Sequence, residues 1–357
     1  MGSGGEEVVL DGGAGEGGGQ ILRTALSLSL CTGTPFRISR IRANRKPSGL
    51  RPQHLACVRG AEAISGGASE GAEVGASELR FQPAKVKAGD YLFEVGTAGS
   101  APLLLQCLFY PLALAGGGRL TLRGGTHLPN SPVYHYLAAV WLPAVQAYGL
   151  SAELRLEQAG FYPQGGGEIG AAVSGPAQPP TLVELPARGT LAEVGVTSFV
   201  AGLPLAIAER QGAAAVAALQ RRGIYSHSEN RPLKSTLSRG TAVFIRAQFE
   251  NTMAGFSALG ERGRPAEQVG EDAAGQLGKF MAGSGALDPH LADQILVPAA
   301  LLAAGLLGDS QPGRTRFTTP EITPHLTTNA DVLQRFLPQI RIDLDAERGE
   351  VAVERRA

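Results

Sequence analysis

Apolar and polar positions follow one pattern that recurs along the chain. Short apolar runs typical of strands alternate with runs of helical spacing, in the order strand, helix, strand, helix, strand, strand. The expected strands cover residues 8–10, 36–43, 78–82, 91–95, 119–122, 152–156, 168–173, 315–319, 340–344 and 351–354, and the expected helices cover 20–30, 52–64, 101–115, 133–148, 291–307 and 329–336. The recurrence predicts an α/β (α+β) protein in which three βαβαββ repeats form the main domain.

One segment interrupts the pattern and predicts a smaller inserted α/β domain. It has alternating strands at 190–199 and 241–249 around an alanine-rich helix at 205–219, and segments rich in Pro, Ala and Gly border it at 174–180 and 260–275. We therefore expect the first two repeats in residues 1–187, the inserted domain in 188–278 and the third repeat in 279–357. Because the insert has few candidate catalytic groups, we expect it to be structural or to help hold a substrate.

Composition excludes several classes of protein. The chain has 357 residues and no net charge, which argues against a general nucleic-acid coat protein. It has no run of about eighteen apolar residues, so no membrane span is expected, and its first residues do not resemble a signal peptide. The three cysteines, Cys31, Cys57 and Cys107, lack metal-type spacing and are expected to be free thiols of a cytosolic (cytoplasmic) protein.

The densest glycine segment, residues 11–19, lies between the first strand and the first helix and is a candidate anion site. Backbone amides at a helix start bind phosphate well, and Glu16, the one acid between these glycines, fits there if a cation separates it from the phosphate. Gly13, Gly15 and Gly18 match the dinucleotide fingerprint, but no acid follows at the next strand, and no Walker lysine occurs. A tight turn without a ligand is the alternative.

Three further segments carry candidate chemistry. The basic loop at 42–54 provides arginines suited to phosphate oxygens, or is simply a solvated loop. His325, expected in a loop before a helix, is a candidate nucleophile toward phosphorus or a cap residue. Asp293 and Gln294 begin an apolar helix, which helix-start chemistry alone also explains. No histidine pair has zinc-helix spacing.

Taken together and in order, these segments resemble the RNA 3'-terminal phosphate cyclase family. The resemblance rests on DGGAGEGGGQILR at 11–23, IRANRKP at 41–47, QHL at 53–55, GSAPLLLQ at 99–106, GFYPQGGG at 160–167, LADQ at 291–294 and HLTTN at 325–329. A bulged hairpin is the alternative explanation for the GFYPQGGG segment alone.

The resemblance implies an ATP-dependent reaction on RNA with a 3'-terminal phosphate. His325 would be adenylylated, AMP would pass to the RNA 3'-phosphate, and the 2'-hydroxyl would displace AMP to leave a 2',3'-cyclic phosphate. Glu16 would hold Mg²⁺ or Mn²⁺. The ATP site would comprise Gln106, His290, Leu291, Ala292, Asp293 and Gln294, and RNA or ATP phosphates would meet Arg23, Arg42, Arg45, Gln53 and His54. No protein partner is implied, and a homodimer is compatible with the sequence.

Two departures and two rival functions qualify this interpretation. His290 replaces the aromatic residue that usually stacks on adenine, and Ala159 replaces a basic residue or histidine before GFYP. A non-catalytic branch of the family works in ribosome assembly and lacks the nucleophile, which His325 argues against. Enolpyruvyl transferases use related α/β repeats and would form no histidine adduct.

Overall fold

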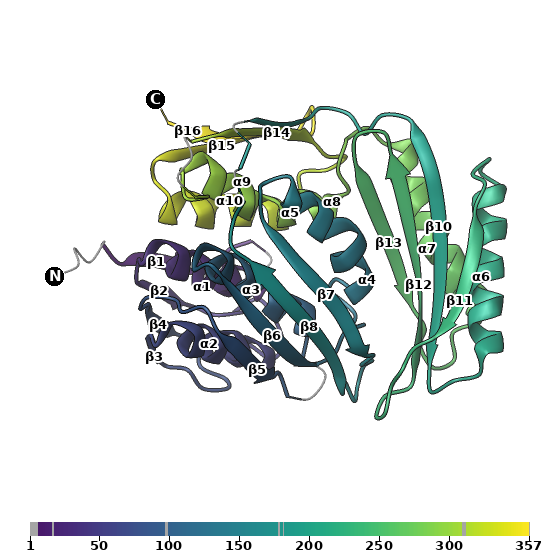
Figure 1. Cartoon of the computed structure of the whole chain (residues 1–357), viewed down its shortest axis with the longest axis horizontal. Helices are drawn as coiled ribbons and strands as arrows, with labels where there is room; N and C mark the ends of the chain where they lie inside the picture. The colour runs from purple at the N-terminus through teal and green to yellow at the C-terminus, as the bar shows by residue number, and fades with distance from the viewer. Residues whose placement is uncertain are drawn as a thin grey trace.

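The architecture comes from a computed structural model, which describes residues 6–15, 18–96, 99–177, 179–180, 182–308 and 312–356. Strands in these ranges form four mixed four-stranded sheets, and helices pack between and against them (Figure 1). The protein is therefore α/β, as the pattern predicts.

The first sheet has the strand order β1-β2-β4-β3. Its first pair is parallel and its other pairs are antiparallel. In chain order its elements are β1 (Val8–Asp11), α1 (Gln20–Thr32), β2 (Phe36–Ser39), α2 (Pro52–Ser65), β3 (Ala68–Glu70) and β4 (Leu79–Gln82).

The second sheet repeats this arrangement as β5-β6-β8-β7, again with a parallel first pair. Its elements are β5 (Asp90–Glu94), α3 (Ala101–Leu114), β6 (Gly117–Gly124), α4 (Tyr134–Tyr136), η1 (Leu137–Trp141), α5 (Leu142–Gln146), β7 (Ser151–Gln158) and β8 (Gly167–Ser174). The helix expected at 133–148 is continuous from Tyr134 to Gln146, and the turn at η1 within it has π-helical hydrogen bonding.

The third sheet, β9-β14-β16-β15, has the same pairing pattern but a divided sequence. Its elements are β9 (Leu182–Leu185), α8 (Pro289–Gln294), α9 (Leu296–Ala303), β14 (Arg314–Thr318), α10 (Pro324–Phe336), β15 (Ile340–Asp345) and β16 (Glu350–Arg355). The insert begins after β9 in the sequence. The first strand of the third sheet therefore lies within residues 1–187, and its other strands lie after the insert.

The insert forms the fourth sheet, β11-β10-β12-β13, with both of its helices packed on it (Figure 1). Its elements are β10 (Leu191–Ala201), α6 (Leu205–Gln220), β11 (His227–Pro232), β12 (Gly240–Phe249), β13 (Met253–Leu259) and α7 (Ala266–Ala282). Val243, Val269 and Leu277 belong to a core separate from the main one.

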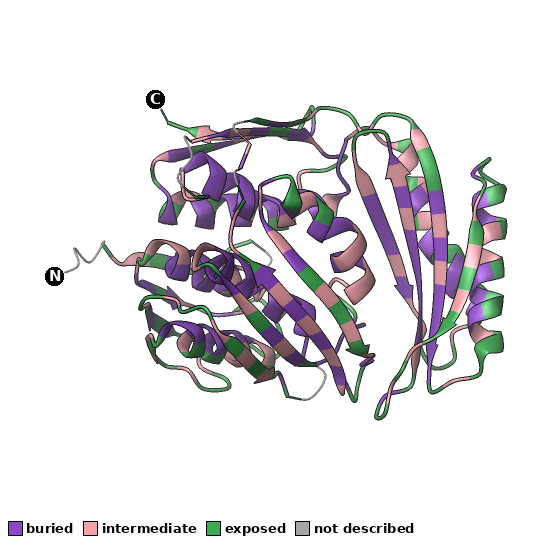
Figure 2. Ribbon diagram, viewed as in Figure 1, coloured by how far each residue is buried: buried purple, intermediate pink, exposed green. Residues whose placement is uncertain are grey.

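The main core lies where α1, α3, α9 and α10 pack between the first three sheets. Every residue of α9 is buried, and α1 contacts α2, α3 and α10 (Figure 2). This packing brings the N-terminal helix of the chain against its last helix.

Four expected boundaries are wrong for identifiable reasons. The strand expected at 36–43 ends at Ser39, since Arg40 and Arg42 have φ of 54° and turn the chain. The helix expected at 329–336 begins at Pro324, where Thr323 caps it by accepting from the Leu326 amide. The helix expected at 291–307 is split at residue 295 into α8 and α9. The glycine-rich border at 260–275 contains the first half of α7.

Candidate active site

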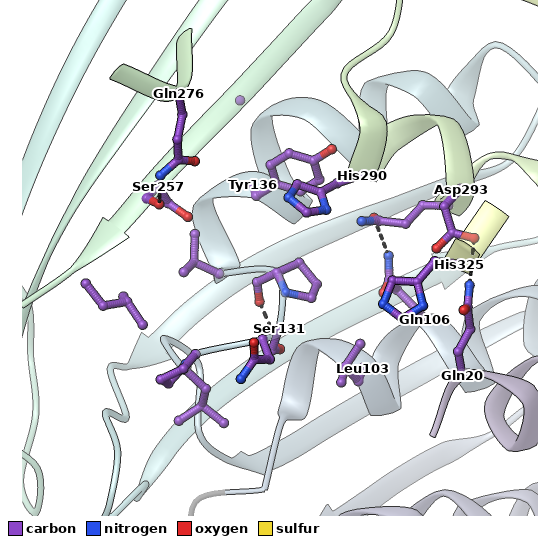
Figure 3. Close-up of a pocket in the computed structure, with 18 of the residues that line it drawn as sticks. Gln20, Leu103, Gln106, Ser131, Tyr136, Ser257, Gln276, His290, Asp293 and His325 are labelled. Carbon is purple, nitrogen blue, oxygen red and sulfur yellow. Dashed lines mark hydrogen bonds between the residues drawn. The ribbon is translucent and has the colours of Figure 1, made fainter. Parts of the chain in front are cut away.

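A cavity of about 1170 Å³ lies between the main domain and the insert. Its walls come from α1, α3, the segment at 128–136, α8 and α10 on one side, and from β13 and α7 on the other (Figure 3). Of the residues predicted from the sequence, it brings together Arg23, Gln106, His290, Asp293, Gln294 and His325.

His325 lies in the first turn of α10, on the wall of this cavity. The helix begins at Pro324, so His325 is fixed by helical backbone rather than by a loop. Its side chain is exposed and lies beside Asp293 and Gln106 (Figure 3). A histidine so placed can reach a phosphate that approaches the helix N-terminus.

Asp293 is the centre of a hydrogen-bond network that joins three helices. Its Oδ1 accepts from Gln20 Nε2 at 2.6 Å and from Asn329 Nδ2 at 3.1 Å, and Asn329 Oδ1 accepts from Thr24 at 2.8 Å. Burial raises the pKa of the Asp293 carboxyl, against the lowering effect of His325 and these two donors. The network holds α1, α8 and α10 together next to His325.

The roles of Gln20 and Asn329 in this network were not predicted from the sequence. Asn329 lies one turn after His325 on α10, so the helical period is a signal that places both residues on one face. Gln20 begins α1 and gave no comparable signal, because its partner is 273 residues away.

Gln106 and Gln294 form the neighbouring part of the wall. Gln106 Nε2 donates to Gln294 Oε1 at 2.7 Å, which joins α3 to α8. Leu291 and Ala292, predicted near ATP, are buried in the core and do not line the cavity. The part of the LADQ motif that faces the cavity is therefore Asp293 and Gln294.

The start of α8 is fixed by the buried carboxylate of Asp288. It accepts from the amides of His290 and Leu291 at 3.0 Å and from the Tyr136 hydroxyl at 3.0 Å. Burial raises the pKa of Asp288. Asp288 thus orients the helix that carries His290, Asp293 and Gln294, and Tyr136 links it to the segment next to the insert.

The glycine turn after β1 meets α10. A Cβ added at Gly15 would collide with the Thr328 hydroxyl, and Gly15 has φ of 56°, so this close approach requires glycine. Asn44 of the basic loop donates to Gly13 O at 2.8 Å. Glu16, the predicted metal ligand, lies outside the described residues.

Arg23 and His54 lie side by side at the first turn of α1. A Cβ at Gly19 would collide with His54 Nε2 and come within 2.8 Å of Arg23 Nη1. His54 Nδ1 accepts from the Arg51 amide at 3.1 Å, so its proton is on Nε2. Burial, with Arg23 nearby, lowers the pKa of His54 to about 3 and keeps the ring neutral.

The other predicted phosphate contacts lie outside the cavity lining, on the Arg23 side. Burial lowers the pKa of Arg42, and repulsion by Arg51 and Arg45 adds to this, so the three guanidiniums form a cationic cluster. A Cβ at Gly99 would approach Gln53 Cβ to 3.2 Å, so Gln53 lies against the residue that precedes Ser100, the N-cap of α3. The basic loop meets the cavity lining through His54, which lies beside Arg23.

The GFYP turn contacts the insert instead of the cavity. Phe161 N donates to Ser238 Oγ at 2.9 Å, and Ala159 N donates to Lys234 O at 2.7 Å. Phe161 also pairs with His127 and Gly165 as isolated bridges. The turn helps join the insert to the second sheet.

The described part of the chain offers neither a metal-ion cluster nor a membrane-spanning helix. It contains no group of three or more His, Cys, Asp and Glu side chains arranged for a metal ion. None of its helices combines the length and apolar character needed to span a bilayer. Cys31, Cys57 and Cys107 are free, as expected.

Comparisons with known proteins agree on one family. The model of the family described as RNA 3'-terminal phosphate cyclase matches residues 14–342. Proteins named RNA 3'-terminal phosphate cyclase are similar to this chain in Methylococcus capsulatus (43% identity, covering 92% of this chain and 90% of the relative), Ralstonia nicotianae (40%, 96% and 94%) and Saccharolobus solfataricus (36%, 96% and 97%). These matches show that the chain belongs to the RNA 3'-terminal phosphate cyclase family.

Proposed function

We propose that this protein uses ATP to convert an RNA 3'-terminal phosphate into a 2',3'-cyclic phosphate. The observation that carries the proposal is the meeting of α10 with the glycine turn, since Gly15 contacts Thr328 one turn after His325. A nucleophile and an anion-binding turn from opposite ends of the chain therefore serve one site.

In the first step, a nitrogen of the His325 imidazole attacks the α-phosphorus of ATP. A nitrogen–phosphorus bond forms, the bond to the bridging oxygen breaks, and pyrophosphate leaves with the electron pair. Asp293 lies beside His325 and can stabilise the positive charge of the adenylylated ring. Gln106, His290 and Gln294 line the part of the cavity proposed to hold the nucleotide.

In the second and third steps, the adenylyl group activates the RNA end. An oxygen of the RNA 3'-phosphate attacks the adenylyl phosphorus and the imidazole leaves. The 2'-hydroxyl then attacks the RNA phosphorus, loses its proton and expels AMP. Arg23, Arg42 and Arg45 would neutralise the phosphates, with neutral His54 as a donor through Nε2 and Gln53 beside it.

Mg²⁺ or Mn²⁺ is part of the proposal. An ion bound by a single carboxylate and by substrate phosphates is typical of Mg²⁺ at nucleotide sites. Glu16, which follows Gly15 in the sequence, would be that carboxylate. The ion would supply charge neutralisation at the ATP phosphates.

Two rival functions fit less well. A non-catalytic role in ribosome assembly would not require an exposed histidine in the cavity wall, and an enolpyruvyl transferase would require no histidine adduct. We place the reaction in the cytoplasm, because Cys57 and Cys107 are buried free thiols, which suits a reducing compartment.

The test uses two RNAs that differ only in the terminal phosphate. With ATP and Mg²⁺, the RNA with a 3'-phosphate should acquire an end that resists phosphatase until acid opens it. The RNA with a 3'-hydroxyl should remain unchanged. A phosphatase-sensitive end after complete ATP turnover would contradict the proposal.

A further inference from the structure

The insert supplies the cavity wall that faces α8. Ser257 of β13 and Gln276 of α7 lie together on this wall, and His290 and Tyr136 lie across the cavity from them (Figure 3). The space next to Gln276 is open, since a Cβ at Gly275 would meet no atom within 4 Å. A planar ligand held by His290 therefore has room to extend toward the insert.

The Gln276 amide has a defined orientation. Its Nε2 donates to the backbone oxygen of Ser257 at 2.9 Å. Because a carbonyl oxygen only accepts hydrogen bonds, the nitrogen must face Ser257, and the amide cannot be flipped. Oε1 is left as an acceptor, and Figure 3 shows it directed away from Ser257 toward the side of Tyr136 and His290.

The opposite wall suits a nucleobase. The imidazole of His290 is exposed to the cavity, and Pro132 adds apolar surface. Such a wall favours the face of a planar base. A base stacked on His290 can turn one edge toward the insert, where Oε1 of Gln276 is available as an acceptor.

We propose that Gln276 makes the site selective for 6-aminopurine nucleotides over 6-oxopurine nucleotides. The amine of adenine donates to Oε1, whereas guanine and hypoxanthine present a carbonyl oxygen at the same place. Two acceptors repel each other, and neither regains the hydrogen bond that it made to water. The inference rests on the proposed function and assigns the insert a part in substrate choice.

The test compares three nucleotides that differ at position 6 of the purine. ATP has an amine there, purine riboside triphosphate has hydrogen, and inosine triphosphate has a carbonyl. Each is incubated with the full-length protein and Mg²⁺ but no RNA, and the rate of covalent nucleotide attachment at limiting nucleotide is measured. The wild type should prefer ATP to purine riboside triphosphate, and that nucleotide to inosine triphosphate.

Gln276→Leu removes the acceptor while keeping similar bulk. The preference for ATP over inosine triphosphate should fall about tenfold, with the three rates converging. The preference is a ratio of two rates measured on the same variant. A partial folding defect lowers both rates by the same factor and leaves the ratio unchanged. Gln220→Leu, on the same insert but outside the cavity, should keep the wild-type ratio.

The outcomes separate this inference from the proposed function. If ATP forms the adduct and Gln276→Leu retains the full preference, the role of Gln276 is wrong and the function stands. If no nucleotide forms an adduct with the wild type, the proposed function fails and the inference fails with it.

Discussion

At the scale of single residues, Gly19 and Gly18 provide a matched pair. A Cβ at Gly19 would collide with His54 and crowd Arg23, whereas one at Gly18 would meet nothing within 4 Å. Gly19→Ala should lower the rate of adenylate formation about 100-fold by displacing these groups, while Gly18→Ala should be close to wild type. Equal rates in the two variants, measured by single-turnover labelling, would remove Arg23 and His54 from the site.

We expect the buried charge of Asp293 to lower the stability of the folded protein while it supports adenylate formation. Its pKa is raised by burial, so its contribution to stability is full below the usual carboxyl pKa of 3.8 and declines as pH rises through the folded-state value. Asp293→Asn keeps an Oδ1 acceptor for Gln20 and Asn329 and removes the buried charge.

Thermal unfolding across pH tests this expectation. At pH 7.5 the Asp293→Asn variant should unfold at the same or a higher temperature than the wild type, and the difference should shrink as the solution is acidified toward pH 3.8. Adenylate formation should fall at pH 7.5. A variant that is less stable only at neutral pH would show that the charge is stabilising.

At the scale of elements, the orientation of α8 depends on its cap. Asp288→Ala removes the acceptor for two backbone amides and for Tyr136, so unfolding free energy should fall by about 2 kcal/mol. Asp288→Asn retains an acceptor oxygen and should lose less. Denaturant titration measures both values, and equal losses would contradict a capping role.

The periodic elements are those that the sequence predicts best. Strands such as β8 and β12 have long alternating or apolar runs, and α1 and α3 have strong apolar character, so local pattern and tertiary burial agree. The short strands β3 and β11 are mostly exposed and polar, and nothing local distinguishes them from loops.

The sequence pattern did not predict the first half of α7, because its glycines allow close helix packing and do not form a turn. A Cβ at Gly270 would collide with the backbone oxygen of Gln211 on α6, so the two helices approach too closely for any other residue. A glycine-rich run is typical of a loop, and only the tertiary contact explains it.

The predicted residues that line the cavity lie in short contiguous motifs. His325, Asp293 and Gln294 were found through short segments whose order resembles one family. Gln20 and Asn329 donate hydrogen bonds to Asp293, which is 273 and 36 residues away in the sequence. Gln276 is oriented by a hydrogen bond to Ser257 on the neighbouring strand β13. Pairings across such separations depend on the fold and leave no local pattern.

At the scale of the whole molecule, two histidines at the joint between the insert and the second sheet, His127 buried and His135 half-buried, predict sensitivity to acid. His127 Nε2 and His135 Nδ1 are 3.0 Å apart, and the rings stack on Phe161 and Phe199. Burial lowers the pKa of His127 well below 6.5 and that of His135 to about 3.

A lowered histidine pKa means that unfolding takes up protons. The stability that these neutral rings contribute is present above pH 6.5 and is lost as pH falls toward 3, at about 1.4 kcal/mol per pH unit for each proton. His135→Phe should reduce the slope of unfolding free energy against pH by about one proton in this window. An unchanged slope would show that His135 is already charged in the folded protein.

The central claim is that His325 carries the adenylyl group, and one measurement tests it directly. The protein is incubated with ATP and Mg²⁺ without RNA, and the peptide containing residue 325 is analysed by mass spectrometry. We predict one adenylyl group, labile to acid, attached to the His325 imidazole and absent from His325→Ala. An adduct on another residue, or an adduct that His325→Ala still forms, would contradict it.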